Sequence, residues 1–98
     1  MKINVTSVHF DADKKLLDFI NKKVVKLQQF DERILGAEII LKLENNMEQG
    51  NKIVEIRLEV PGNDLFARRQ SKTFEEAVTE AIDALRNQVI KTKEKKRS

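Results

Sequence analysis

The feature that most constrains the fold of this chain is the alternation of residue types over residues 54–60, within a segment 52–60 that has the clearest strand pattern of the chain. Every second side chain is apolar and the side chains between them are charged: Val54, Ile56, Leu58 and Val60 against Glu55, Arg57 and Glu59. Successive side chains of a β-strand point to opposite faces, so this segment is predicted to be a strand with one buried face and one face in water. Its sheet should therefore be covered on one side only.

Three other segments also have strand patterns. Residues 2–8 and 37–44 alternate in the same way, and residues 64–71 are a weaker fourth strand. Polar residues over 45–51 predict a turn before the clearest strand, and Pro61-Gly62 after it suits the centre of a type II turn. The three later strands are joined by short turns, so they should be antiparallel.

A helix is predicted from about residue 12 to residue 29. Apolar residues recur there at helical spacing: Leu16, Leu17, Ile20, Val24 and Leu27. Asp11 is a suitable N-cap, and Asp13 adds negative charge to the first turn, where the helix dipole favours it. Gly36, beyond this helix, is expected to let the chain turn.

A second helix is predicted from residue 74 to about residue 93. Thr73 and Glu76 form a capping box at its start. Its apolar stripe consists of six residues: Phe74, Val78, Ala81, Ile82, Leu85 and Val89. Such a stripe indicates that one face of the helix packs on the sheet. We expect the helix to fray into a basic tail over about residues 91–98.

The order of these elements predicts an α+β fold, β-α-β-β-β-α, with a four-stranded mixed sheet and both helices on one face. The first two strands are joined through a helix, so they should be parallel with a right-handed crossover. The length of 98 residues suits a single domain, 1–98. A ferredoxin-like regulatory module is an alternative, but it needs a strand after the second helix, and no strand pattern follows Val89.

Composition excludes several classes of chemistry. The chain has no Cys and one His, His9, so a transition-metal site and thiolate chemistry lack ligands. Its three scattered glycines form no phosphate-binding loop, and we therefore expect no enzyme, no cofactor and no small-molecule substrate. No apolar run approaches the roughly 20 residues that span a bilayer, and the strand pattern starts directly after Met1, where a signal peptide would lie. These features predict a cytoplasmic protein without a membrane partner.

Positive charge is unevenly distributed along the chain, although the net charge is only +3. From Arg86 onward six basic residues accompany one acid, whereas residues 73–85 carry four acids and no base. The second helix is therefore strongly polarised, and its later part is a candidate contact for an acidic partner. Arg68-Arg69 on the last strand are either a guard against edge pairing or an RNA contact.

The first helix also has a basic side. Lys15, Lys22 and Lys26 project within about 40° of one another, roughly opposite the apolar stripe, and Lys23 lies nearer to that stripe. Two basic helices packed side by side would form a cationic surface suited to phosphates. The alternative is an ordinary solvated helix face, which is the commoner role of such lysines. Phe19, near the lysines, either stacks on a base or packs at the edge of the core.

A set of short motifs runs in order along nearly the whole chain: Phe19 through Lys23, Lys26-Leu27, Phe30, Arg33-Ile34, Leu41 through Glu44, Ile82 through Leu85, Gln88, and Lys91 through Lys95. Taken together, their order and spacing resemble the short form of the ribosome hibernation promoting factors. That family also holds the ribosome-associated inhibitor and is known as the sigma-54 modulation protein family. The resemblance is the most specific indication of function in the sequence.

This resemblance implies a fold similar to double-stranded-RNA-binding domains. It also implies binding to the 30S subunit and 70S ribosome, through 16S rRNA in the decoding channel where messenger RNA and transfer RNAs would lie. Translation would then be inhibited in stress or stationary phase. By position, seven residues inherit the RNA-binding role: Lys22, Lys23, Lys26, Arg86, Lys91, Lys93 and Lys95. The alternative function is a structured-RNA-binding module that acts off the ribosome.

The chain departs from the family pattern in its last helix. The family opens this helix with Asp-x-Tyr, whereas this chain has Thr73-Phe74-Glu75, so the tyrosine contact is lost. The family often has an arginine where Asn87 stands, and Arg86 beside it points about 100° away. The chain ends at Ser98 without the additional domain of long-form members, which leaves open whether it pairs ribosomes or only idles 70S particles.

Overall fold

The computed structural model describes residues 1–44 and 50–97, and for residues 94–97 it describes their place in a helix but not their side chains. Its elements, in chain order, are β1 (Lys2–Val8), α1 (Lys14–Val25), a short 3₁₀ helix η1 (Lys26–Gln29), β2 (Gly36–Leu43), β3 (Lys52–Glu59), β4 (Leu65–Ser71) and α2 (Phe74–Arg97). The predicted order β-α-β-β-β-α is confirmed. The turn predicted over residues 45–51 falls mostly outside the described residues.

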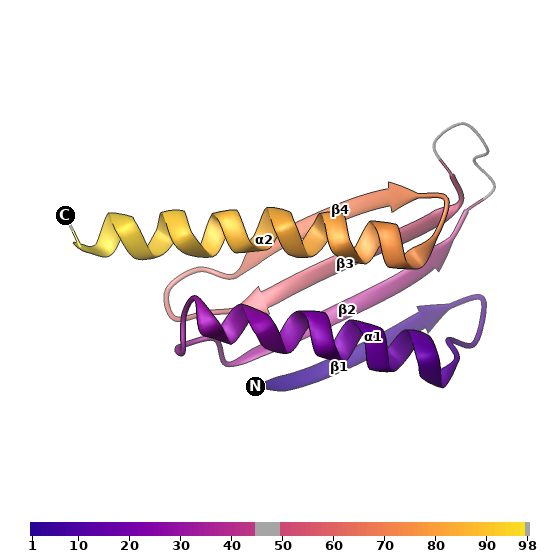
Figure 1. Ribbon diagram of the computed structural model, residues 1–98, viewed down its shortest axis with the longest axis horizontal. Helices are drawn as coiled ribbons and strands as arrows, with labels where there is room; N and C mark the ends of the chain where they lie inside the picture. Colours follow the sequence, from indigo (N-terminus) through magenta and orange to yellow (C-terminus); the bar gives the residue numbers. More distant parts are fainter. Residues whose placement is uncertain (45–49, 98) are drawn as a thin grey trace.

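The four strands form one sheet in the order β1-β2-β3-β4. β1 pairs with β2 in parallel, and the other two pairs are antiparallel, as the connections predicted. Both helices lie on the same face of this sheet and run in the same direction, so their C-terminal ends lie at the same end of the molecule (Figure 1). No strand follows α2 within the described residues, so the structure lends no support to the ferredoxin-like alternative.

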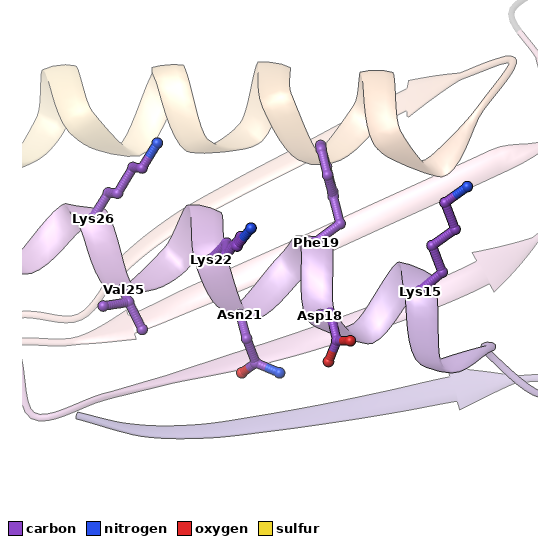
Figure 2. Close-up of a pocket in the computed structure, with 7 residues that line it drawn as sticks. All are labelled: Lys15, Asp18, Phe19, Asn21, Lys22, Val25 and Lys26. Atoms are coloured by element: carbon purple, nitrogen blue, oxygen red, sulfur yellow. The ribbon is translucent and has the colours of Figure 1, made fainter.

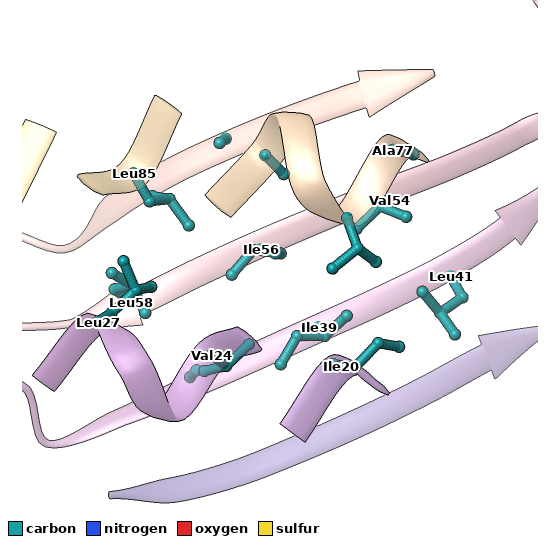
Figure 3. Packing of buried hydrophobic residues seen from close by; sticks show 14 of the residues in the cluster. Ile20, Val24, Leu27, Ile39, Leu41, Val54, Ile56, Leu58, Ala77 and Leu85 are labelled. Carbon is teal, nitrogen blue, oxygen red and sulfur yellow. The ribbon is translucent and has the colours of Figure 1, made fainter. Parts of the chain in front are cut away.

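The core fills the space between the sheet and the two helices (Figure 3). The inward residues of β3 are completely buried, as their alternation predicted: Val54, Ile56 and Leu58. Ile20 and Val24 of α1 reach this layer from one side, and Leu85 of α2 reaches it from the other. Leu17, which belonged to the predicted stripe, is only half-buried. The hydrophobic stripes therefore account for the position of both helices.

The start of α1 differs from the prediction. Asp13, rather than Asp11, is the N-cap, and its carboxylate accepts a hydrogen bond of 2.8 Å from the backbone N–H of Leu16. The helix consequently begins at Lys14, two residues later than expected. Its last turn is the 3₁₀ helix η1, which keeps Leu27 buried in the core. Either aspartate can cap a helix, and the packing of the stripe selects the second.

The predicted capping box of α2 is half confirmed. The backbone N–H of Glu76 donates to the Thr73 hydroxyl over 3.1 Å, but the Glu76 carboxylate accepts from the hydroxyl of Ser71 instead of returning to the cap. The predicted end near residue 93 is wrong, because α2 continues to Arg97. The backbone of the basic segment is therefore helical as far as Arg97.

Gly36 does not turn the chain, contrary to expectation. It is the first residue of β2, and only Gly50 and Gly62 among the glycines have positive φ. A Cβ atom added at Gly36 would lie 2.9 Å from the backbone carbonyl oxygen of Lys2, its partner in the parallel pair. The absence of a side chain thus permits the close approach of β1 and β2.

Candidate nucleic-acid interface

The common direction of the two helices brings their basic segments to the same end of the molecule (Figure 1). Lys22 and Lys23 lie in the last turn of α1, and Lys26 opens η1 directly after them. Lys93 of α2 reaches the residue that ends η1, Phe30, so the basic part of α2 lies beside this point. Residues distant in sequence therefore contribute to one cationic end.

The lysines of α1 surround an open hollow of about 830 Å³ (Figure 2). Its lining residues all belong to α1 and η1: Lys15, Asp18, Phe19, Asn21, Lys22, Val25 and Lys26. In Figure 2, Lys15, Phe19 and Lys26 point toward α2, whereas Asp18 and Val25 point toward β1. Lys22 and Lys26 are exposed, and no ion pair involves them in the described part of the chain.

Lys23 differs from its neighbours. It is half-buried, and its ammonium nitrogen lies 5.6 Å from the centre of the Phe19 ring, in the geometry of a cation–π contact. The sequence prediction that Lys23 lies nearer to the apolar stripe is confirmed. Phe19 itself is half-buried and packs against the core, so it lies at the boundary between the core and the lysine side of α1.

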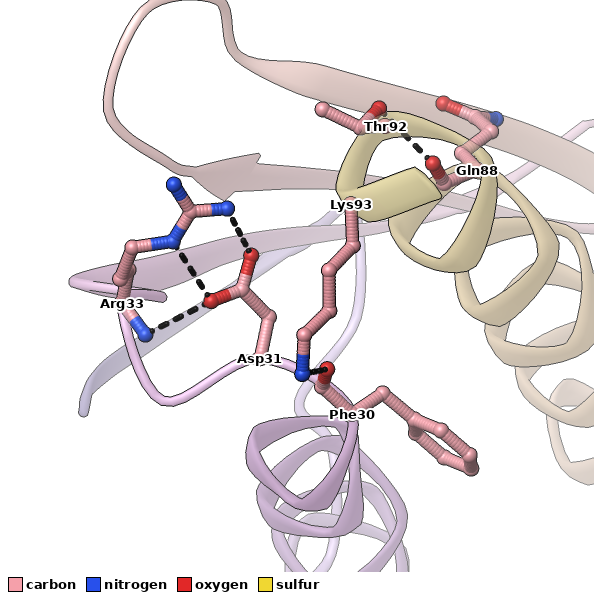
Figure 4. Close-up of polar contacts among 6 residues, drawn as sticks. All are labelled: Phe30, Asp31, Arg33, Gln88, Thr92 and Lys93. Atoms are coloured by element: carbon pink, nitrogen blue, oxygen red, sulfur yellow. Dashed lines mark hydrogen bonds and ion pairs between the residues drawn. The ribbon is translucent and has the colours of Figure 1, made fainter. Parts of the chain in front are cut away.

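The predicted residues of α2 have different surroundings. Arg86 is exposed, with a long ion pair of 3.8 Å to Asp83 one turn earlier. Lys93 is half-buried, and its ammonium group donates a hydrogen bond of 3.2 Å to the backbone carbonyl of Phe30 (Figure 4). Lys91 is exposed. Lys95 lies in α2, but its side chain is not among those described.

These residues project from different sides of α2. The Lys93 side chain reaches η1, whereas the Gln88 side chain donates a 3.0 Å hydrogen bond to the Phe66 carbonyl of β4, on the opposite flank of the helix. At about 100° per residue, Arg86 shares the side of Lys93, and Lys91 points roughly 160° away from it. The structure therefore brings Arg86 and Lys93 to the side of α1 and leaves Lys91 on the other side.

An ion pair that the sequence reasoning missed lies next to this junction. The Arg33 guanidinium donates to both carboxylate oxygens of Asp31, at 2.9 and 2.8 Å, and the Asp31 side chain is only 7% exposed (Figure 4). These hydrogen bonds, with the nearby charges of Arg33 and Lys93, lower the pKa of Asp31 to about 2. The only signal in the sequence was an acid and a base two positions apart directly after a helix.

The opposite face of the sheet has charges of both signs that pair with one another. Lys42 and Arg68 each lie 3.4 Å from the same carboxylate oxygen of Glu55, and Glu38 faces Arg57 across the β2–β3 pair. Part of the positive charge on this face is therefore compensated by Glu55. On the helical side of the sheet, by contrast, Lys15, Lys22 and Lys26 line the hollow, and no ion pair involves them in the described part of the chain.

The described part of the chain offers no metal centre. No group of three or more His, Asp or Glu side chains gathers there in a position to hold an ion. None of its helices is long and apolar enough to cross a membrane. His9, the single histidine, is exposed and has a positive φ of 69° at the end of β1.

Two solved structures have the same fold. The N-terminal domain of Protein Y from Thermus thermophilus superimposes with a TM-score of 0.82 at 22% sequence identity, covering 94% of this chain and 99% of that one. A structure described as a ribosomal subunit interface protein from Coxiella burnetii gives a TM-score of 0.85 at 25% identity, covering 95% and 98%. The arrangement of one sheet with two helices on one face is therefore shared with these proteins.

Sequence comparison identifies the family. Curated relatives include ribosome hibernation promoting factors from Klebsiella oxytoca, 30% identical over 95 residues, and from Pseudomonas putida, 26% identical over 98 residues. The alignments cover 97% and 100% of this chain and 96% and 92% of those proteins. The family model described as Sigma 54 modulation protein / S30EA ribosomal protein matches residues 3–97. The chain therefore belongs to the Sigma 54 modulation protein / S30EA ribosomal protein family, as its sequence motifs predicted.

Proposed function

We propose that this protein is a ribosome hibernation factor that acts as a single ribosome-binding domain, residues 1–98. It binds 16S rRNA of the 30S subunit in the decoding channel, as a subunit or within the 70S ribosome. There it blocks the sites of messenger RNA and transfer RNA and inhibits translation in stress or stationary phase in the cytoplasm. The family consists of binding proteins and not of enzymes, so occupation of the channel is the whole mechanism.

The observation that carries this proposal is the common orientation of the two basic helices. Lys22 and Lys26 are exposed at the C-terminal end of the α1–η1 unit, and the hydrogen bond from Lys93 to Phe30 keeps the basic part of α2 beside them. Ammonium and guanidinium groups on one rigid surface suit the regularly spaced phosphates of folded RNA. The opposite face of the sheet, where charges are paired, remains directed away from the RNA.

The proposed RNA contacts do not have equal roles. Lys22, Lys26 and Arg86 are exposed and reach phosphates directly, and Lys23 contributes from the edge of the Phe19 ring. Lys91 and Lys95 are the remaining proposed contacts on α2, and Lys91 would reach RNA from the side of α2 that faces away from α1. Lys93 adds positive charge, but its hydrogen bond to the Phe30 carbonyl makes the positioning of α2 its first role.

Co-sedimentation with purified small ribosomal subunits over a salt series tests the proposal. Neutralised phosphates release counterions, so affinity should fall roughly a thousandfold or more over a fourfold rise in salt if six or more phosphates are contacted. Free structured RNA is added as a competitor. Displacement of the protein by equimolar structured RNA would favour a module that acts off the ribosome, and binding that ignores salt would contradict both functions.

A further inference from the structure

The hollow on α1 combines an aromatic ring, apolar surface and positive charge. Phe19 and Val25 line it, and Val25 is 49% exposed although it is apolar. Lys15, Lys22 and Lys26 stand around it, and the stems of such side chains add further apolar surface below their ammonium groups. Phosphates alone would need the charges but not the apolar surface.

We propose that this hollow holds one unpaired RNA base, which stacks on Phe19 while Lys15, Lys22 and Lys26 contact the phosphates on either side of that nucleotide. The inference rests on the proposed function and specifies its ligand: a bulged or flipped nucleotide, not a continuous duplex. Unpaired bases are the part of RNA that proteins stack on aromatic side chains, because bases in a duplex already stack on one another.

The surroundings of Phe19 support this role. The ring is held at the edge of the core, so it is already ordered before RNA arrives. The Lys23 ammonium group lies 5.6 Å from the centre of the ring. Lys23 is not among the residues that line the hollow, so it does not occupy the proposed base position. In Figure 2 the ring points to the same side as Lys15 and Lys26. A base in the hollow would therefore meet the aromatic group and the phosphate ligands together.

The test uses two RNA hairpins of equal length, one fully paired and one with a single bulged nucleotide, together with purified small ribosomal subunits. The Phe19→Leu variant keeps apolar volume at the core edge but removes the aromatic face. Stacking of one base is worth roughly 1–3 kcal/mol, so the variant should bind the bulged hairpin and the subunits roughly 5- to 150-fold more weakly. Its affinity for the paired hairpin should be that of the parent.

Salt dependence separates stacking from phosphate contact. Phe19→Leu should leave the slope of log affinity against log salt unchanged, whereas Lys22→Ala should reduce that slope by about 0.7–0.9 because one phosphate contact is lost. A Phe19→Leu variant that binds the bulged hairpin as tightly as the parent overturns the inference, and so does an equal loss on both hairpins. Failure of the parent to bind the bulged hairpin also overturns it.

A direct readout comes from the composition of the chain, which has no Trp and no Tyr. Phe19→Trp therefore introduces a single strong fluorophore at the proposed stacking position. Its emission should be quenched by the bulged hairpin and not by the paired one, and unchanged emission with both contradicts the inference. If the parent sediments with subunits in a salt-sensitive way while Phe19→Trp shows no quenching, the stacking site fails and the proposed function stands.

Discussion

Lys93 donates a hydrogen bond of 3.2 Å to the backbone carbonyl of Phe30, and thereby joins two residues that are 63 positions apart. Phe30 ends the 3₁₀ helix η1, where carbonyl groups lack partners within the helix and the helix dipole is negative. An ammonium group is well suited to such a position. The contact ties the later part of α2 to the end of η1, in addition to the core packing that positions the helix.

The first prediction concerns this contact. Lys93→Met keeps the apolar stem but removes the ammonium group, so the Phe30 carbonyl loses its partner. We expect the free energy of unfolding to fall by roughly 1 kcal/mol. Lys91→Met is the matched control, because Lys91 is exposed on the other side of α2, and it should change stability by less than about 0.5 kcal/mol. Urea denaturation of both variants measures the difference, and equal stabilities would contradict a positioning role for Lys93.

The second prediction concerns the Asp31–Arg33 ion pair and acid pH. The pKa of Asp31 is lowered to about 2 from 3.8, so the folded state favours the ionised carboxylate. The resulting stabilisation, roughly 1–2 kcal/mol, is fully present above pH 4 and is lost as the pH falls through about 2. Thermal unfolding of the parent should therefore show a loss of stability over this range.

Asp31→Asn is the control for this pH dependence. The variant cannot ionise at position 31, so it should be less stable than the parent at neutral pH, and the difference should shrink toward pH 2. Asp18→Asn, at an exposed position of α1, is the matched substitution and should change stability at neutral pH by less than about 0.5 kcal/mol. A constant difference between parent and Asp31→Asn at every pH would show that the carboxylate charge is not what stabilises this turn.

The third prediction concerns the lysines of α1. A triple variant with Lys22→Ala, Lys23→Ala and Lys26→Ala should stay folded with a modest loss of stability. Lys22 and Lys26 are exposed, and exposed charges usually change stability by within about 0.5 kcal/mol each, while the half-buried Lys23 gives up its contact with Phe19, worth about 0.5–1 kcal/mol. The variant should nevertheless lose most binding to small subunits and most inhibition of cell-free translation. The slope of log affinity against log salt should fall by about 2–3 as three phosphate contacts are lost.

A second triple variant controls for net charge. Lys2→Ala, Lys14→Ala and Lys72→Ala remove the same charge from exposed positions outside the proposed surface. This variant should keep most ribosome binding, since its lysines make none of the proposed contacts. If both triple variants bind small subunits as tightly as the parent, the α1 lysines are not the contact surface, and the second helix becomes the candidate contact surface.

The fourth prediction separates binding from folding on the same helix. Ile20 is completely buried between α1 and the sheet, so Ile20→Ala removes core packing and leaves a cavity. It should lower the free energy of unfolding by roughly 2–5 kcal/mol, without a change in surface charge. At a temperature where it remains folded, the variant should show the parent salt slope. A reduced slope in folded Ile20→Ala would mean that the packing of α1 sets the phosphate contacts.

Periodicity along the chain predicted the elements of this fold because each strand and helix buries one face. The alternation over residues 54–60 predicted β3 and its buried side, and the helical stripes predicted both helices and their common face. The residues at which the elements begin and end were harder to predict from the sequence. Asp11 and Asp13 are equally good caps by composition, and the choice between them depends on how Leu16 packs in the core.

The candidate site was predictable residue by residue but not as a surface. The lysine side of α1 follows from helical geometry alone, and so does the half-buried position of Lys23. The contact from Lys93 to Phe30 joins segments far apart in sequence, and no local pattern indicates it. The same holds for the hollow beside Phe19, whose shape depends on the path of the chain from α1 into η1.

The common direction of the two helices also separates charge along the molecule. Four of the acids of α2 precede Arg86, and two of them, Glu75 and Glu76, lie in its first turn, whereas its bases begin at Arg86 and continue toward the end that the α1 lysines share. In the field of a polyanion such a molecule experiences a torque that turns its cationic end forward before any contact forms. This steering acts within a few Debye lengths of about 8 Å at physiological salt, so it raises the rate of productive encounter.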